Sequence, residues 1–364
     1  MEVTCLKQLL CLSDAPWTAV PNRTQQLMAR LRSAQILFFG PPARRGDNSF
    51  RQPGRRVRPN IIAYTLPHIL GAEERHTLLF QRDQKRLGRF IERAMSRHRF
   101  REPLLWCTTP SYVHLLDLIP HRGLVYDCAR DWSCLPIRWE SELTLEADVA
   151  FAASPELADH LSPCNENVAI LPNGVNYSMF CQQSLPSNEI QSLRRGRPIL
   201  GYAGPLWRDL DLRPLIAAAQ AMPEAGFVLA GAREDCPLDR LPPNVYCLEP
   251  GAAADLPQSL SYFDVCLSFL RRRHSNDIIP GHIYEYLSAG KPIVCMYERD
   301  QVECFPDVIY GAYSTKEFAQ LCRRALAETG DWARKRRQAY GEAASWPRRA
   351  QEVERILEGI GLYD

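Results

Sequence analysis

The sequence predicts an α/β protein of two tandem domains, each built on a parallel sheet. Short apolar runs alternate with longer helical patterns along the chain, and this alternation stops once, at a polar segment, before it restarts. Such alternation is typical of parallel sheets with crossover helices. A chain of 364 residues is also too long for one small domain, and its 46% hydrophobic and 24% charged residues exclude disordered and fibrous classes.

Apolar runs bounded by turn residues predict twelve strands. Strands of a parallel sheet are covered on both faces, so they are almost continuously apolar. The predicted strands span residues 4–12, 36–39, 61–65, 104–107, 124–126, 149–152, 168–170, 199–203, 227–230, 245–248, 265–269 and 293–296.

Helical patterns connect these runs. Apolar residues spaced three and four apart predict helices over residues 23–32 and 81–99. Ser345 stands at an N-cap position, Pro347 falls in the first turn, and an amphipathic run continues to Gly359. The chain is therefore expected to end in a closing helix.

A polar segment separates the two halves. Residues 181–198 contain two prolines and a glycine and show no periodicity, which predicts an interdomain linker. We expect an N-terminal domain over residues 1–180, a C-terminal domain over residues 199–344, and the closing helix over residues 345–364.

Composition excludes several classes of protein. The 44 Lys and Arg against 42 Asp and Glu create no overall field that would attract nucleic acid. Thirteen cysteines without C-x-x-C spacing indicate a reducing compartment and no structural zinc. Lys7 and Gln8 interrupt the first apolar stretch, unlike a secretory signal, and no run approaches the ~18 apolar residues of a membrane span. A cytoplasmic protein is expected.

Charge is sorted within the first half of the chain. Residues 30–101 hold 17 Lys and Arg but 5 Asp and Glu, whereas residues 102–190 hold 3 and 12. The helix over residues 81–99 is basic and amphipathic, which suits an anionic membrane surface. Alternatively, its apolar stripe packs on the sheet and its arginines are solvated. Packing is the favoured interpretation, since every surface helix of an α/β domain has such a stripe, and the excess of basic residues is the observation that supports a peripheral membrane contact through residues 44–101.

The most informative motif is NDIIPGHIYEYLSAGKPIVC, residues 276–295. Pro280 and Gly281 break the chain, a short helix is expected over residues 282–288, and Gly290 ends it before a strand. A helix that starts at such a break presents free backbone N–H groups and the positive end of its dipole. An anion such as a diphosphate would bind there.

The side chains of this motif suit a nucleotide sugar. Gly281, His282 and Ile283 would bind the diphosphate, and Glu285, one turn further, could accept hydrogen bonds from the two hydroxyls of a ribose. Asp277, eight residues before Glu285, could reach a sugar hydroxyl. The alternative is ordinary packing, with the histidine on the surface. No set of metal ligands stands at suitable spacing around the motif, so no metal is expected.

This stretch resembles the signature of glycosyltransferases of the GT-B architecture, particularly glycosyltransferase family 4. In that family two acids separated by seven residues precede a small-residue turn and a strand. Asp277 and Glu285 occupy these positions, although Asp replaces the usual Glu, and only Pro280 and Gly281 represent the glycine-rich pair between them. The resemblance implies two Rossmann-like domains facing across a cleft, a donor held by the second domain, and a C-terminal helix that crosses back.

Other segments resemble landmarks of the same family. Residues 169–180 resemble the entry to the hinge, residues 199–212 the first strand and glycine turn of the donor domain, and residues 261–270 the strand before the acid loop. The resemblance places Gly204 at the donor phosphates. A basic pair usually follows that turn, and here Arg208 represents it without a lysine.

The N-terminal half resembles transferases of teichuronic acid and exopolysaccharide synthesis. Residues 15–31 and 125–133 carry this resemblance. Asp127 is expected to act as a base or to orient an acceptor hydroxyl, with Arg23 and Asp131 on the acceptor side. The alternatives are that Asp127 ends a strand and caps the next turn, and that Arg23 is a surface arginine behind an N-cap.

The resemblance implies a hexosyltransferase-type enzyme that uses a UDP- or GDP-sugar and no further cofactor. It would transfer a sugar to a glycan or lipid-linked acceptor in cell-surface polysaccharide synthesis, with retention of configuration and without a metal. One alternative is a non-catalytic nucleotide- or glycan-binding subunit of a transferase complex, which the missing lysine and the altered acid loop favour. Another is a nucleotide-sugar epimerase of the same architecture.

Overall fold

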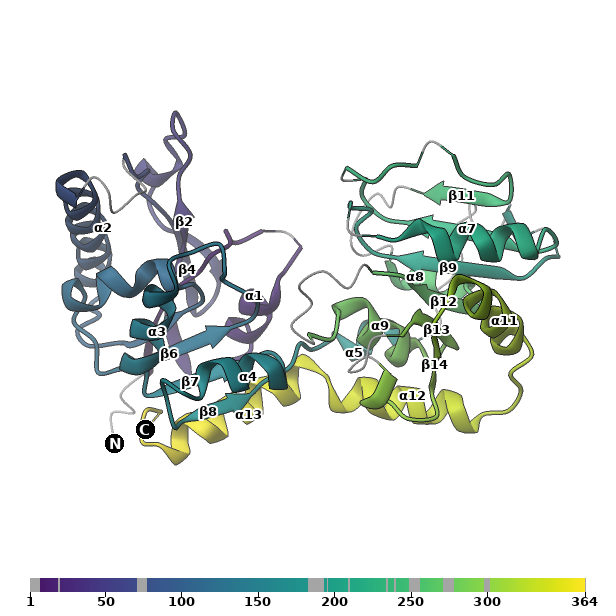
Figure 1. Cartoon of the computed structure of the whole chain (residues 1–364). Coiled ribbons are helices and arrows are strands. Elements are labelled where there is room, and N and C mark those ends of the chain that lie inside the picture. The colour runs from purple at the N-terminus through teal and green to yellow at the C-terminus, as the bar shows by residue number, and fades with distance from the viewer. Residues whose placement is uncertain are drawn as a thin grey trace. The chain divides into compact units, whose positions relative to one another are not determined.

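A computed structural model describes eleven segments of the chain, and these form two compact units. The N-terminal unit comprises Met1–Pro172 and Arg349–Asp364, and the C-terminal unit comprises Asn173–Arg348. Each unit is an α/β domain with its own sheet (Figure 1). The described residues are 7–18, 20–70, 77–182, 193–194, 196–208, 210–233, 235–238, 240–248, 256–270, 278–297 and 302–363.

The N-terminal unit holds a sheet of eight strands in the order β3-β4-β2-β1-β5-β6-β7-β8. All neighbouring strands pair in parallel except β3, which runs antiparallel to β4 at one edge. The strands are β1 (Lys7–Leu12), β2 (Ala34–Pro42), β3 (Arg55–Arg58), β4 (Ile61–Leu66), β5 (Leu104–Cys107), β6 (Gly123–Cys128), β7 (Val149–Ala152) and β8 (Val168–Ile170).

Helices connect these strands, and local capping sets where several of them begin. The Asn22 side chain accepts from Gln25 N, Thr109 accepts from Ser111 N, and Ser154 accepts from Leu157 N, each at the start of a helix. The helices are α1 (Arg23–Met28), η1 (Ser49–Arg51), α2 (Thr77–Arg97), η3 (Pro110–Leu118), α3 (Ile137–Glu146), α4 (Pro155–Leu161) and α13 (Trp346–Gly359).

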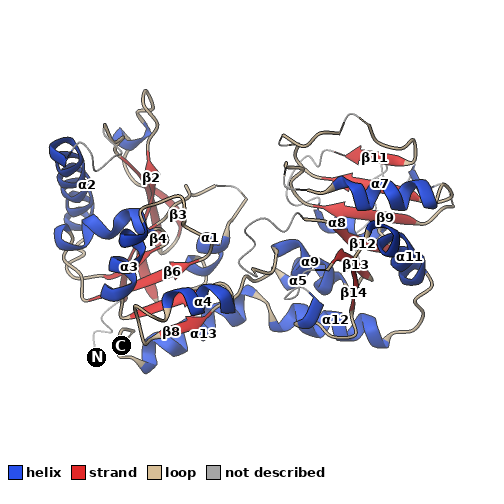
Figure 2. Ribbon diagram, in the orientation of Figure 1, coloured by secondary structure: helices blue, strands red, loops and turns tan. Residues whose placement is uncertain are grey.

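The C-terminal unit holds a parallel sheet of six strands in the order β11-β10-β9-β12-β13-β14 (Figure 2). Its strands are β9 (Ile199–Ala203), β10 (Gly226–Ala230), β11 (Val245–Leu248), β12 (Val265–Ser268), β13 (Ile293–Met296) and β14 (Ile309–Ala312). Its helices are α5 (Tyr177–Phe180), α7 (Leu212–Ala221), α8 (Leu256–Tyr262), α9 (Gly281–Ala289), α11 (Thr315–Leu326) and α12 (Trp332–Ala343).

Two apolar clusters cover the two faces of this sheet. Within β9, Ile199 and Ala203 belong to the cluster that contains α8 and α9, whereas Leu200 and Tyr202 belong to the cluster that contains α7 and α11. Successive strand residues point to opposite faces, so both faces of β9 are buried. Because both faces are covered, a ligand can approach the sheet at the ends of its strands, and in open parallel sheets it binds at the carboxyl ends.

The structure confirms the α/β class and the predicted strands within the described residues. Two ends of the predicted strands are exceptions. Residues 4–6 of the first predicted strand lie outside the described residues, and β12 ends at Ser268 rather than at residue 269. Two strands were not predicted. β3 reads RRVR and pairs at one sheet edge, where charged residues are common, and β14 is short and contains Gly311.

The predicted helices are present with different ends. α1 stops at Met28 rather than residue 32, and α2 covers Thr77–Arg97 rather than residues 81–99. The apolar stripe of α2 is buried, as the packing alternative requires, because Leu87, Ile91 and Met95 are at most 3% exposed. In the described part of the chain no helix is long and apolar enough to cross a membrane.

The division into units differs from the expected domain ends. The first unit ends at Pro172 rather than at residue 180. It also includes Arg349–Asp364, which starts within the closing helix. The expected linker over residues 181–198 lies largely outside the described residues. The division at 172 places the hinge-like segment with the C-terminal unit, since Val175 bridges to Ser345 there.

Candidate functional site

Hydrogen bonds connect helix α9 to the carboxyl ends of β9 and β12. The Ala203 N–H donates to Tyr286 Oη (2.9 Å), and this hydroxyl donates back to Ala203 O (3.3 Å). At the end of β12, Ser268 Oγ lies 2.9 Å from His282 Nε2. These bonds hold α9 beside two neighbouring strand ends, the position at which open parallel sheets place their ligands.

A pair of glycines shapes the turn after β9. Gly204 has a φ of +154° and its N–H donates to Ala230 O (2.9 Å). A Cβ atom on Gly231 would lie 1.7 Å from Gly204 O. Only glycine at position 231 allows the turns after β9 and β10 to approach so closely.

The N-terminus of α9 faces open space. Its N-cap residue, Pro280, makes no side-chain capping bond, and a Cβ atom on Gly281 would meet nothing within 4 Å. The Ile283 N–H already donates to Pro280 O (3.1 Å), so Gly281 and His282 carry the N–H groups best placed for a ligand. Before the helix, Asn173 Nδ2 donates to Ile279 O (3.3 Å) and holds the loop.

His282 is a partly buried, neutral side chain. Its ring centroid lies 5.4 Å from that of Tyr202 and 5.3 Å from that of Tyr286. Burial lowers the pKa of His282 to about 4. The alternative of a surface histidine is wrong, because this side chain packs between two tyrosines and bonds to Ser268.

Glu285 is a partly buried carboxyl group with altered acidity. Burial raises its pKa to about 7, and among the described residues no cation lies within ion-pair distance. Burial and, to a smaller extent, the charge of Glu285 raise the pKa of Tyr202 on β9. Glu285 therefore lies near the end of β9, and near pH 7 it can either donate or accept a hydrogen bond.

Two other expected donor residues are less well defined. Arg208 is exposed in the segment after β9. Asp277 lies outside the described residues. An Asp-x-Asp pair, Asp209 and Asp211, was not among the expected site residues; Asp209 also lies outside the described residues, and Asp211 caps α7 and bonds to Arg213.

The structure brings together Asp127 and Arg23 in the N-terminal unit. Asp127 is fully buried at the end of β6, where Arg23 Nη2 and Nε lie 2.9 and 3.1 Å from its Oδ1. The same Nη2 donates to Leu171 O (2.7 Å). The pair ties α1 to the ends of β6 and β8, so Asp127 is engaged by a cation and Arg23 is not the surface arginine of the alternative.

Asp131 and Arg130 form separate local structures. Asp131 accepts from both the N–H (2.7 Å) and the hydroxyl (2.9 Å) of Ser133, which closes a turn. The guanidinium of Arg130 lies 4.1 Å from the Trp132 ring centroid and 3.1 Å from Asp14 Oδ2. Arg130 thus links the segment after β6 to the segment after β1.

A cavity of about 630 Å³, here called the strand-end cavity, lies at the carboxyl ends of β1, β2, β5 and β6. Asp14 lines it, 25% exposed, and accepts from Thr108 Oγ1 at 2.9 Å. Indole and hydroxyl groups accompany this carboxylate, a combination suited to a sugar-like ligand. Its polar and aromatic lining residues include Asp14, Thr109, Ser111, Arg130, Trp132 and Trp139.

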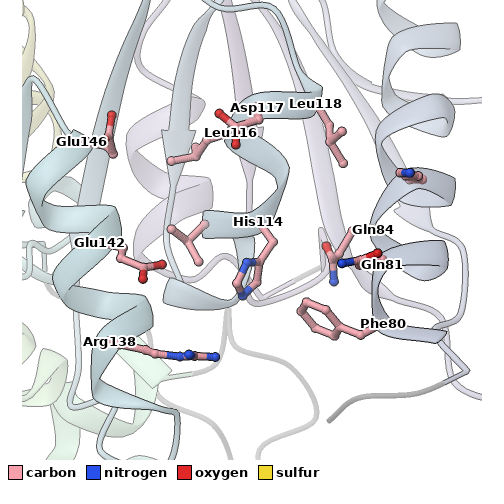
Figure 3. Close-up of a pocket in the computed structure, with 12 residues that line it drawn as sticks. Phe80, Gln81, Gln84, His114, Leu116, Asp117, Leu118, Arg138, Glu142 and Glu146 are labelled. Carbon is pink, nitrogen blue, oxygen red and sulfur yellow. The ribbon is translucent and has the colours of Figure 1, made fainter. Parts of the chain in front are cut away.

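A neighbouring cavity of about 650 Å³ shares Phe80 and Gln84 with the strand-end cavity. Its lining comes only from α2, η3 and α3. Figure 3 shows the His114 ring between Phe80 of α2 and Arg138 and Glu142 of α3. No strand end contributes to it, so it is a less suitable place for substrate.

Comparisons with known proteins decide the fold. Sucrose-phosphate synthase from Thermosynechococcus elongatus matches with a TM-score of 0.71 at 13% identity, over 98% of this chain and all of that one. Anabaena HepE, solved with UDP and glucose, matches with a TM-score of 0.66 at 15% identity, over 97% and 99%. The chain has the GT-B fold.

Sequence comparison agrees with the GT-B assignment. Residues 208–355 match the family described as glycosyl transferase-like, so this part of the chain is glycosyltransferase-like. A Bacillus subtilis (strain 168) protein provisionally named teichuronic acid biosynthesis glycosyltransferase TuaH is 23% identical over 336 residues, 84% of each chain. An E. coli trehalose-6-phosphate structure bound with UDP-2-fluoro glucose matches over 96% of this chain and 99% of that one, with a TM-score of 0.72 and 12% identity.

Within this GT-B chain, sequence reasoning missed Asp14 and its partner Thr108. The available signal was position: Asp14 follows β1 and Thr108 follows β5, and parallel neighbouring strands end at one edge. The part of the chain that the structure describes holds no group of three or more His, Cys, Asp or Glu that could bind a metal ion. The resemblance to family 4 in particular stays a prediction.

Proposed function

We propose that this protein is a hexosyltransferase-type enzyme of cell-surface polysaccharide synthesis. It transfers a sugar from a UDP- or GDP-sugar to a glycan or lipid-linked acceptor. The single observation that carries this proposal is the uncapped N-terminus of α9, open at Gly281 and one turn before Glu285, at the ends of β9 and β12. Anabaena HepE, with the same fold, was solved with UDP and glucose, which supports a UDP-sugar donor.

The donor diphosphate is bound at the first turn of α9. The N–H groups of Gly281 and His282, the helix dipole and Arg208 stabilise the negative charge that develops as the diphosphate departs. The neutral ring of His282 adds a hydrogen bond without a proton transfer, because its pKa is far below 7. Glu285 accepts hydrogen bonds from the ribose, and Asp277 contacts the sugar.

The acceptor is bound in the strand-end cavity of the N-terminal unit. Asp14 accepts a hydrogen bond from the acceptor hydroxyl, held in place by Thr108 and Arg130. Asp127 has a positioning role instead, because its carboxylate is buried against Arg23. Trp132 and Trp139 contribute apolar atoms to the wall of this cavity beside the acceptor.

We further propose that the enzyme retains the configuration of the transferred sugar, that it needs no metal, and that it acts at the inner face of a membrane. Retention and metal independence come from the resemblance to family 4 and from a diphosphate site built of backbone N–H groups and arginine. The basic segment over residues 44–101 supports the membrane contact.

Nucleotide binding and turnover test this function with one matched pair of variants. Calorimetry with UDP and GDP identifies the base, and hydrolysis of a panel of nucleotide sugars identifies the donor. Glu285→Ala should weaken nucleotide binding about tenfold or more, the usual cost of losing hydrogen bonds to a charged group. Glu342→Ala, which removes an exposed carboxylate of α12 in the same unit, is the control. Equal affinity in both variants would contradict the donor site.

A second candidate is a nucleotide- or glycan-binding subunit without turnover. Two observations favour it. The carboxylate of Asp127 is paired with Arg23, and no lysine stands beside Arg208 to complete the basic pair. Saturable UDP binding without hydrolysis or transfer, for every donor of the panel and with membrane extract as acceptor source, would identify such a subunit. Turnover that Asp14→Asn reduces about a hundredfold would exclude it.

A further inference from the structure

A third cavity, here called the arginine pocket, lies in the N-terminal unit apart from the strand-end cavity. Its volume is about 600 Å³, and no residue lines both cavities. Residues around η1, of the segment from β4 to Pro67 and of the helix α2 line this open pocket, in which Arg51, Arg93 and Arg97 are exposed. Its lining residues are Phe50, Arg51, Gln52, Pro53, Tyr64, Pro67, Arg86, Phe90, Arg93, Ala94 and Arg97.

The charged side chains that line this pocket are arginines. Among the described residues, four arginines line it and no carboxylate does. Arg86 Nη2 lies 3.5 Å from Asp83, but within the described segments no acidic side chain pairs with Arg51, Arg93 or Arg97. Four guanidinium groups around one cavity repel one another unless an anion is present. The described lining of the pocket therefore carries an excess of positive charge.

The placement of these arginines is specific within α2. Arg86, Phe90, Arg93 and Arg97 follow one another at helical spacing and form the wall of the pocket, whereas Arg89 on the same helix does not line it. Arg89 instead donates to Lys85 O (3.1 Å). Simple solvation of a basic helix does not explain why three arginines of α2 join Arg51, from a distant segment, around one cavity.

Packed aromatic rings form one side of the pocket. Tyr64 Oη lies 2.8 Å from His98 Nε2, and the Tyr64 ring stacks on Phe39 with centroids 5.3 Å apart. Phe90 packs edge-on against Tyr64 at 6.2 Å. Burial, with Arg97 and Arg56 nearby, lowers the pKa of His98, so the positive charge at neutral pH comes from arginine.

We propose that the arginine pocket binds a phosphate-bearing anion, a phosphomonoester or diphosphate group held by the guanidinium forks of Arg51, Arg93 and Arg97. Planar guanidinium groups bind phosphate oxygens in pairs, which suits them to this ligand more than lysine. Phe50 and Phe90 contact the part of the ligand next to the phosphate. The site lies in the other unit from α9, so it does not depend on the donor site.

The phosphate can come from a lipid headgroup or from a soluble compound, and two probes separate these sources. The first is inorganic pyrophosphate, titrated by calorimetry in the presence of saturating UDP. The second is phosphatidylcholine vesicles with and without phosphatidic acid, assayed by flotation. Arg93→Ala/Arg97→Ala is the test variant, and Arg82→Ala/Arg89→Ala removes the same charge from α2 outside the pocket.

The wild-type protein should bind at least one probe saturably. Arg93→Ala/Arg97→Ala should weaken that binding about tenfold or more, and Arg82→Ala/Arg89→Ala by no more than about twofold. If Arg93→Ala/Arg97→Ala weakens only binding to the vesicles, the ligand is a lipid phosphate. If it weakens binding of pyrophosphate, the ligand is a soluble phosphate compound. Equal weakening by both double variants, or no saturable binding of either probe, overturns the proposal.

Folding and donor binding are checked on the same samples. Arg93→Lys/Arg97→Lys keeps the charge but loses the forked geometry, so it should bind with intermediate affinity if guanidinium groups hold the phosphate. Thermal melts of all variants show whether the N-terminal unit is folded. UDP affinity should be the same in all of them, so a failure of the donor site is seen separately from a failure of the arginine pocket.

Discussion

At Glu285, burial raises the pKa of the side chain to about 7, so its charge changes within the neutral range. An ionised carboxylate is the better acceptor for two ribose hydroxyls. We expect UDP affinity to increase more steeply between about pH 6 and pH 8 in the wild-type protein than in Glu285→Gln, in which only the terminal phosphate of UDP itself still changes charge. Calorimetry at several pH values measures this. A wild-type affinity without a pH step would contradict the ribose role.

The stability of the C-terminal unit should depend on His282 in acid. Because burial lowers the folded-state pKa to about 4, the unfolded chain takes up this proton first, near pH 6.5. The free energy of unfolding should therefore fall by about 1–3 kcal/mol from this group as the pH decreases from about 6.5 to 4. Denaturant titrations of His282→Gln should show a smaller fall. His160→Gln, an exposed histidine of the N-terminal unit, is the control.

At the scale of one element, the N-terminus of α9 and the glycine turn after β10 respond differently to an added methyl group. Gly281→Ala meets no atom within 4 Å and replaces glycine in a helix, so stability should stay or rise by about 0.5–1 kcal/mol. UDP affinity should nevertheless fall, because the methyl group enters the ligand space. Gly231→Ala should lower the melting temperature, since its Cβ would clash with Gly204 O. An unchanged UDP affinity in Gly281→Ala would place the diphosphate elsewhere.

Helix α12 is anchored by a buried ion pair. Arg337 is fully buried; its Nη1 and Nη2 lie 2.7 and 2.6 Å from the two oxygens of Glu328, and its Nε donates to Val308 O at 2.8 Å. Burial acts to raise the pKa of Glu328, but the hydrogen bonds and charge of Arg337 overcome it and lower the pKa.

Removal of one partner of this pair should be costly. Arg337→Met removes the donor of the Val308 carbonyl and the cation of Glu328, which keeps its hydrogen bond from Tyr310 Oη. We therefore expect the free energy of unfolding to fall by about 3–5 kcal/mol, measured by denaturant unfolding. The double variant Arg337→Met/Glu328→Gln should recover part of that loss. A double variant as unstable as the single one would show that the guanidinium acts by packing alone.

At the scale of the whole molecule, α13 begins in the C-terminal unit and ends in the N-terminal unit. Val353, Leu357 and Tyr363 are at most 1% exposed, and Ser33 Oγ lies 3.2 Å from Tyr363 Oη. Residues 353–363 are therefore part of the N-terminal core, although they follow the C-terminal unit in sequence.

This arrangement predicts that a change near the C-terminus affects the N-terminal unit. Leu357→Ala should destabilise that unit by about 2–5 kcal/mol and leave UDP binding by the C-terminal unit unchanged. Limited proteolysis, with UDP calorimetry on the same sample, measures both effects. The exposed Arg355→Ala in the same helix is the control. Loss of UDP binding in Leu357→Ala alone would contradict the division into units.

The sequence by itself determined the α/β class, the predicted strands and the start of a helix at Pro280 and Gly281. These features depend on local periodicity and on residues adjacent in the chain, so one sequence suffices to predict them. It also marked Glu285, because helical spacing alone places that residue one turn after the break. β3 reads RRVR and lacks an apolar run of its own, and β14 contains Gly311. Both strands lie at an edge of their sheet, so their formation depends on the neighbouring strand.

Only the tertiary structure decided which carboxylates are available to a substrate. Asp127 and Arg23 are 104 residues apart, and Asp14 and Thr108 are 94 apart, so no local pattern shows either contact. Both aspartates follow or end a strand, yet one is buried against a cation and the other lines a cavity. Likewise, the arginine pocket exists because the fold brings Arg51 to the face of α2. The physical reason is that burial and charge pairing depend on distances in space, which separation along the chain does not fix.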